Sequence, residues 1–109
     1  MRLKKYGMKL VCKPRSIMGA CIGLHGLMTD KDIRWWDCLP QGSDRKIPKN
    51  ELWIREDHCK KGKILDEPIE VHEDVELLLM KEYELPYNIA HPIAEIAEAR
   101  WKRHKKRLP

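Results

Sequence analysis

The sequence predicts an α+β fold, with a small N-terminal β-sheet followed by a C-terminal helix pair. Before Pro68, apolar residues occur in short runs separated by glycine and proline, which is typical of strands and turns. After Pro68, they recur at a helical period. A chain of 109 residues has the length of one domain. We therefore expect a single domain over residues 1–99 and a basic C-terminal tail over residues 100–109.

Strand patterns and turn signals account for most of the N-terminal half. Apolar and other residues alternate over Lys4–Lys13, which predicts a first strand. The segment Ser16–Thr29 contains three glycines but matches neither common phosphate-binding motif, so turns with a short irregular or strand segment are expected. The segments Asp32–Cys38 and Glu51–Arg55 are centred on apolar residues, and each is predicted to be a strand.

The first predicted helix follows Pro68 and runs to about Tyr83. Its apolar residues are spaced so that they lie on one side of a helix, with most charged residues on the other sides. These apolar residues are Val71, Val75, Leu78 and Leu79. Leu85-Pro86 then ends the helix, because a residue that precedes proline is disfavoured in helical conformation.

A second predicted helix begins at Asn88, whose side chain is expected to cap it. Pro92 fits this helix only in the first turn, where its missing N–H group has no partner to lose. The apolar face of this helix consists of Ile89, Ile93, Ile96 and Ala97. Towards its end the helix gives way to the basic tail. We therefore expect an antiparallel helical hairpin.

Composition and cysteine spacing limit the cellular setting. The longest apolar runs, such as Leu77–Met80, are far shorter than the roughly 20 residues needed to cross a bilayer, so no membrane contact is expected. Lys13 and Arg15 interrupt the N-terminal apolar run before a signal peptide can form, which favours a cytoplasmic location. The four cysteines form no C-x-x-C pair and are predicted to be reduced, buried thiols; a four-cysteine zinc site is the alternative.

The helix pair carries a candidate metal site. His72 and Glu76 are four residues apart and would project from the same side of the first helix. His91 opens the second helix, so a hairpin could bring it back against the first. Two histidines and one glutamate suit zinc, and they also suit iron, manganese or nickel. We expect a divalent metal ion, with zinc favoured.

Neighbouring polar residues would complete the site. Glu73, next to His72, would be the general base that takes a proton from an attacking water molecule. Glu95 and Glu98 lie on roughly the same side of the second helix as His91, and either could bind the metal or hold the second nitrogen of a ligating histidine. Tyr87 could donate to a developing oxyanion or simply pack at the hairpin turn.

The C-terminal half resembles small prokaryotic and phage proteins akin to minimal gluzincin-like zincins, with H-E-x-x-E in place of H-E-x-x-H. The matching residues and segments are Glu51-Leu52-Trp53-Ile54, His72-Glu73-x-x-Glu76, Leu79-Met80, Leu85-Pro86-Tyr87, Ala90-His91, Ala94 and Glu98. The resemblance implies a zinc metallopeptidase that acts on a peptide or protein. It also implies that Glu51–Arg55 is the strand on the substrate side of the cleft, and it ranks Glu98 ahead of Glu95. Glu76 stands where the family has its second histidine, so His91 would have to replace that ligand.

Two other functions remain open at the level of sequence. A nucleic acid could bind the basic tail, with Trp101 as a stacking surface. The basic residues of this segment are Arg100, Lys102, Arg103, Lys105, Lys106 and Arg107. Alternatively, the chain could be a metal-binding interaction or structural protein without turnover. The sequence does not determine the oligomeric state.

Overall fold

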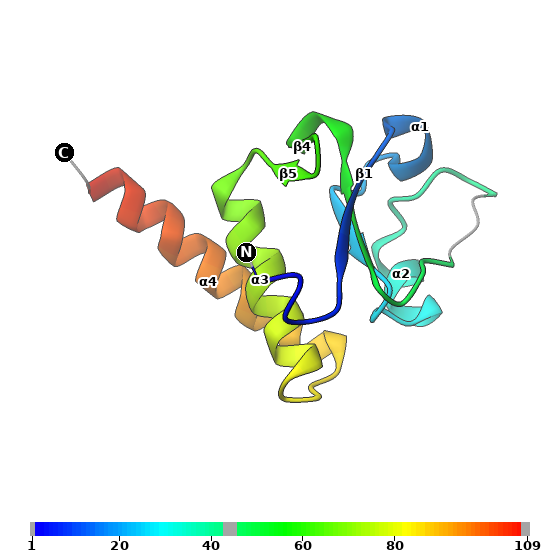
Figure 1. Cartoon of the computed structure of the whole chain (residues 1–109). Coiled ribbons are helices and arrows are strands. Elements are labelled where there is room, and N and C mark those ends of the chain that lie inside the picture. The colour runs from blue at the N-terminus through cyan, green and yellow to red at the C-terminus, as the bar shows by residue number, and fades with distance from the viewer. Residues whose placement is uncertain (1, 43–45, 108–109) are drawn as a thin grey trace. The chain divides into compact units, whose positions relative to one another are not determined.

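The computed structural model describes residues 2–42 and 46–107 and confirms the α+β class (Figure 1). Short strands occupy the N-terminal half, and two long helices occupy the C-terminal half. The elements are β1 (Lys9–Lys13), α1 (Arg15–Met18), β2 (Gly23–His25), α2 (Asp30–Trp36), β3 (Glu51–Arg55), η1 (Glu56–His58), β4 (Cys59–Lys60), β5 (Lys63–Ile64), α3 (Glu67–Lys81) and α4 (Tyr87–Arg107). None of the described helices is long and apolar enough to span a membrane.

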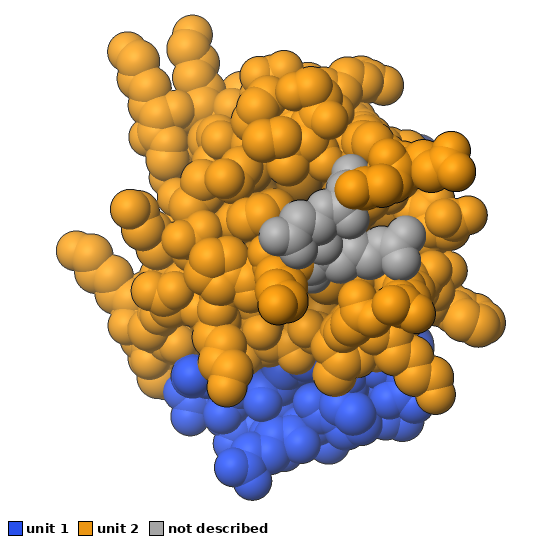
Figure 2. Space-filling view, turned by 90° about the vertical axis from the view of Figure 1, so that its right-hand side faces the viewer, with its two compact units in different colours: residues 1–2, 66–109 blue, residues 3–65 orange. Residues whose placement is uncertain are grey.

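The chain divides into two compact units, coloured separately in Figure 2. Unit 2 is Leu3–Leu65 and contains all the strands that the structure describes. Unit 1 is Met1–Arg2 with Asp66–Pro109 and contains α3 and α4. The predicted boundary between residues 99 and 100 falls inside α4, because the basic segment stays helical through Arg107; residues 108–109 lie outside the described part.

Unit 2 is built on a three-stranded sheet with the order β1-β3-β2. The central strand β3 pairs in parallel with β1 and antiparallel with β2, and its residues Leu52 and Ile54 are fully buried. Among the described residues, β3 therefore has a hydrogen-bonded strand on each side. It offers no free edge to an extended peptide, which argues against the role expected of Glu51–Arg55 as a substrate-side strand.

The first strand is shorter than predicted. β1 begins at Lys9, while the chain before it forms a turn in which the Leu3 carbonyl accepts hydrogen bonds from the N–H groups of Tyr6 and Met8. Gly7 takes a positive φ of 67° in this turn, a conformation that glycine adopts readily. The apolar alternation in the sequence therefore extends over both the turn around Gly7 and the strand, which is why the strand was predicted too long.

The segment predicted as a strand at Asp32–Cys38 is a helix, so that prediction is wrong. Thr29 and Asp32 form a capping box at the start of α2: the Thr29 hydroxyl accepts from the Asp32 N–H at 3.2 Å, and the Asp32 carboxylate accepts from the Thr29 N–H at 2.9 Å. This pair satisfies two backbone donors that a helix start leaves unpaired. The helix ends at its C-cap residue Asp37, whose backbone adopts the left-handed helical conformation.

The glycine-rich segment Ser16–Thr29 contains turns, the short helix α1 and the strand β2, as its prediction of turns and a short strand allowed. Gly26 is required by packing, because a Cβ atom there would lie 2.0 Å from the Pro48 carbonyl oxygen. A side chain at this position would force the two segments apart.

The cysteines form two disulfides, Cys12–Cys59 and Cys21–Cys38, so the prediction of reduced thiols is wrong. Their Cα atoms are 5.6 and 5.0 Å apart, within the usual range for a disulfide. The bonds close loops with sequence separations of 47 and 17, worth about 4 and about 3 kcal/mol in the chain-entropy estimate. A unit as small as unit 2 buries little apolar area, and these bonds compensate for its limited core.

Unit 1 is an antiparallel hairpin of α3 and α4. The Asp66 side chain caps α3 by accepting from the Ile69 N–H at 3.3 Å, and Pro68 lies in the first turn. The prediction that Asn88 caps the second helix is wrong. α4 begins at Tyr87, one residue earlier, and the Pro86 carbonyl accepts hydrogen bonds from the N–H groups of Ile89 and Ala90. Pro92 consequently lies beyond the first turn, inside α4.

In both helices, the face that is buried in the structure differs from the apolar face that the sequence predicted. In α3 the buried residues are His72, Glu73, Glu76 and Leu77. In α4, Ala90 and Ala94 are fully buried, whereas Ile89, Ile93 and Ile96 remain 47%, 42% and 54% exposed. Ala90 and Ala94 each follow an isoleucine, which places them about 100° further around the helix. The predicted apolar face of the second helix is therefore a surface stripe, and polar side chains fill the inner face of the first.

Candidate metal centre

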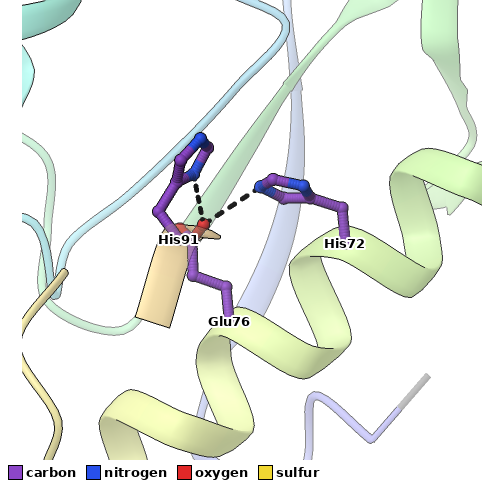
Figure 3. A group of neighbouring side chains, drawn as sticks. All are labelled: His72, Glu76 and His91. Atoms are coloured by element: carbon purple, nitrogen blue, oxygen red, sulfur yellow. Dashed lines mark hydrogen bonds and ion pairs between the residues drawn. The ribbon is translucent and has the colours of Figure 1, made fainter. Parts of the chain in front are cut away.

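Three predicted ligands meet between the two helices (Figure 3). His72 and Glu76 project from neighbouring turns of α3, and His91 reaches them from the first turns of α4. Nε2 of His72 lies 3.0 Å and Nδ1 of His91 lies 2.9 Å from the same atom, Oε2 of Glu76. Glu76 is only 2% exposed. Two imidazoles thus converge on one buried carboxylate oxygen, and this group could hold a metal ion.

Each histidine has a second carboxylate at its other ring nitrogen. Nδ1 of His72 lies 3.0 Å from Oε1 of Glu98, an ion-pair contact without hydrogen-bond geometry. Nε2 of His91 lies 2.5 Å from Oε1 of Glu95, whose side chain is 57% exposed. Carboxylates at this position hold the ring of a ligating histidine in place and fix its tautomer. Both glutamates singled out in the sequence therefore lie beside a histidine and outside the three-residue group.

Glu73 and Tyr87 border the group. A carboxylate oxygen of Glu73 lies within 4.8 Å of one of Glu76, and the Glu73 side chain is buried. The Tyr87 hydroxyl lies 3.1 Å from Nδ1 of His91, and the two rings stack with centroids 5.1 Å apart. Tyr87 is buried at the hairpin turn, as the packing alternative expected, and its hydroxyl lies next to a candidate ligand. Its role as an oxyanion donor stays a prediction.

The surrounding carboxylates make both histidines more basic. Burial opposes protonation of His72, but its hydrogen bond to Glu76 and the charges of Glu73, Glu76 and Glu98 outweigh this effect and raise its pKa to about 9. Burial also opposes protonation of His91; the hydrogen bond and charge of Glu76 prevail and raise its pKa as well. In the metal-free protein the His72 imidazole is thus a cation beside the Glu76 carboxylate near neutral pH, and the same carboxylate favours protonation of His91. A metal ion would replace their protons.

We predict that Glu98→Gln weakens metal binding by about 10- to 100-fold, the usual effect of losing a carboxylate that holds a ligating histidine. The amide keeps the shape of the side chain and loses the charge beside His72. Isothermal titration of the chelator-washed protein measures the effect, and Glu82→Gln on the exposed end of α3 is the matched control. Equal affinities of Glu98→Gln and the control would show that Glu98 does not support the site.

A second prediction concerns the metal-free protein. Because the pKa of His72 is raised from 6.5 to about 9, its protonation stabilises the fold fully below about pH 6.5, and this stabilisation disappears as the pH rises through about 9. The shift corresponds to about 3 kcal/mol at about 1.4 kcal/mol per unit. Glu76→Gln removes the main acceptor, so it should lower the free energy of unfolding by about 2 to 3 kcal/mol at about pH 6 and by much less at about pH 10.

Urea unfolding in the presence of a chelator, followed by helical circular dichroism, tests this prediction at both pH values. Glu95→Gln is the control, since its partly exposed ion pair with His91 contributes less than about 1 kcal/mol. A loss in Glu76→Gln that is the same at both pH values would contradict an electrostatic role for the pair His72–Glu76.

The basic residues at the end of α4 are only partly engaged within unit 1. Lys102 pairs with Glu98 at 3.0 Å, and Lys105 pairs with Glu67 at 3.1 Å. Trp101 is half-buried, and Lys105 lies over its ring at 5.7 Å, so this ring is less open for stacking than the sequence indicated.

An apolar groove lined by Val71 of α3 and six residues of α4 was not foreseen from the sequence. The signal that could have revealed it is the three isoleucines spaced along α4 on the side away from the histidine.

No family model, curated protein or solved structure matches this chain. The resemblance to gluzincin-like zincins accordingly remains a prediction, and the candidate site rests on its geometry.

Proposed function

We propose that this chain is a zinc-dependent hydrolase that cleaves peptide bonds, with the metal held by His72, Glu76 and His91. The observation that carries the proposal is the convergence of two imidazole nitrogens on one buried glutamate oxygen, at 3.0 and 2.9 Å. A buried ion cluster, even when its charges are paired, is often no more stabilising than well-packed apolar residues of the same volume, so this one is more readily explained by a function than by stability.

The donor set fits zinc in kind and in spacing. Zinc binds imidazole nitrogen and carboxylate oxygen at about 2.0 to 2.2 Å, so two tetrahedral ligand atoms are about 3.3 Å apart. Nε2 of His72 and Nδ1 of His91 each need to move only a few tenths of an ångström away from Oε2 of Glu76 to reach this spacing. Three protein ligands leave one position open, the arrangement of catalytic rather than structural zinc sites.

Zinc bound there would supply Lewis-acid chemistry, polarising a substrate carbonyl and making water more acidic. Glu73 lies close enough to the ligand set to take the proton of the attacking water and to return it to the leaving amine. The Tyr87 hydroxyl, beside His91, can donate a hydrogen bond to the carbonyl oxygen as negative charge develops on it. Glu98 and Glu95 keep the imidazoles oriented.

Metal analysis combined with a cleavage assay tests the proposal. The protein is washed with chelator, reconstituted separately with zinc, manganese, iron and nickel, and analysed for metal content. Each form is then incubated with an unfolded protein substrate, and the products are identified by mass spectrometry. One equivalent of zinc with cleavage that stops on chelation is the expected result. One equivalent without cleavage of any substrate would leave a metal-binding protein without turnover, and no retained metal would reject the site.

A further inference from the structure

The helix pair contains an apolar groove, here called the α4 groove, with a volume of about 480 Å³. Its lining residues are Val71, Ile93, Ile96, Ala97, Arg100, Trp101 and His104. None of them belongs to the candidate metal centre. Since Ile93 and Ile96 are 42% and 54% exposed, the groove has an apolar floor open to solvent. Apolar side chains gathered in one solvent-open groove point to an interaction site when polar groups beside them also lack partners.

Polar groups at one end of the α4 groove lack partners. Arg100 makes no ion pair with any residue that the structure describes, in contrast to Lys102 and Lys105 nearby. The indole Nε1 of Trp101 is buried and has no hydrogen-bond acceptor in the described part of the chain. A buried donor without an acceptor costs free energy unless a partner supplies one. This end of the groove therefore favours a ligand with carboxylate or carbonyl oxygens.

We propose that the α4 groove binds an acidic, amphipathic helical segment of another protein. Apolar side chains of the partner, spaced at three and four residues, would pack on Ile93 and Ile96, and a carboxylate would pair with Arg100. Six of the eight residues from Arg100 to Arg107 are basic, so the groove attracts an acidic ligand at longer range as well. The inference is independent of the proposed hydrolase activity, because the groove and the metal centre share no residue.

Charge also argues against two other occupants. In a second copy, α4 carries only two carboxylates, Glu95 and Glu98, and both are already paired within their own chain, with His91 and with His72 and Lys102. Six of the eight residues 100–107 of that copy are basic and would repel Arg100. A nucleic acid would satisfy the cations but gain little from a floor of valine, isoleucine and alanine. An acidic helix satisfies both the apolar floor and the charged end.

Fluorescence anisotropy with labelled probes tests the proposal. The first probe is a capped peptide of about 12 residues, enough to span Ile93 to His104, with leucine at helical spacing and glutamate elsewhere. The second has lysine in place of every glutamate, and the third is a single-stranded oligouridine. Arg100→Glu and Ile96→Ser alter the groove. Lys106→Glu and Ile89→Ser are matched controls on the same helix, because they make comparable changes at exposed residues that do not line the groove.

The acidic peptide should bind, and Arg100→Glu and Ile96→Ser should each weaken it by about tenfold or more, whereas both controls remain within about threefold of the parent. Equal binding of the lysine peptide, or no binding of the acidic one, would overturn the proposal. The proposal would also be overturned if oligouridine bound more tightly than the acidic peptide and if Arg100→Glu and Lys106→Glu reduced that binding equally. Sedimentation of the protein alone adds a last arm: a dimer that Ile96→Ser dissociates would mean that a second copy occupies the groove.

Discussion

His91→Ala is expected to abolish tight metal binding while leaving the helix pair folded. His91 is the one donor of the three-residue group that comes from α4; His72 and Glu76 alone would leave two ligands from one helix. Losing an outer carboxylate commonly costs about 10- to 100-fold in affinity, so the loss of a ligand should exceed about 100-fold. The side chain of His91 is partly exposed, and its removal creates no large cavity.

Titration calorimetry with zinc on the chelator-washed variant measures the loss. His104→Ala is the matched control, because it makes the same substitution on the same helix outside the metal centre. Circular dichroism should show the same helix content in both variants. If His91→Ala still took up one equivalent of zinc with the affinity of the control, the group formed by His72, Glu76 and His91 would not be the metal site.

Elements with a strong local signal were predicted well. β3 has the predicted bounds, Glu51–Arg55, because a short apolar segment between a proline–lysine–asparagine turn and a charged run has few alternatives. α3 begins at Glu67 and places Pro68 in its first turn, one turn earlier than the first apolar residue of the predicted face. Proline needs no N–H partner there, so the helix can start before the apolar pattern does.

The errors have two sources, which are a capping signal stronger than the apolar pattern and contacts between distant residues. At α2, Ile33, Trp35 and Trp36 gave a strand-like pattern, whereas the capping box of Thr29 and Asp32 determines a helix. The disulfides Cys12–Cys59 and Cys21–Cys38 join residues with no diagnostic spacing. Their partners are brought together by the fold, and this arrangement is not encoded in any local segment.

The residues of the candidate metal centre could be predicted from their spacing in the sequence, but their burial could not. The i, i+4 pair His72 and Glu76 and the nearby His91 could be located because helix geometry and a short hairpin connection constrain them strongly. Hydrophobic periodicity then predicted that Val71 and Ile93 face inward. In the structure, the polar side chains and the alanines do so instead. Local rules fail most often at functional sites, so the reversal of faces is itself an indication of function.

Glu73→Gln is expected to retain one equivalent of zinc and to lose about 10²- to 10⁴-fold of the hydrolytic rate, the usual contribution of a general base. Glutamine preserves the size of this buried side chain but cannot accept a proton. A carboxylate oxygen of Glu73 lies within 4.8 Å of one of the proposed ligand Glu76, yet Glu73 is not in the group of His72, Glu76 and His91. Its loss should therefore affect proton transfer more than metal affinity.

Metal content and cleavage rate, measured on the same preparation, separate the roles that Glu73 could have. Glu82→Gln, an exposed change at the end of α3, should leave both quantities unchanged. Loss of zinc together with activity in Glu73→Gln would make Glu73 a ligand, with Glu76 bridging the histidines in a different way. Full activity with full zinc content would remove Glu73 from the chemistry and assign the proton to another group. Only retained zinc with lost cleavage supports a general base next to His72, in the place where an H-E pair on a helix puts it.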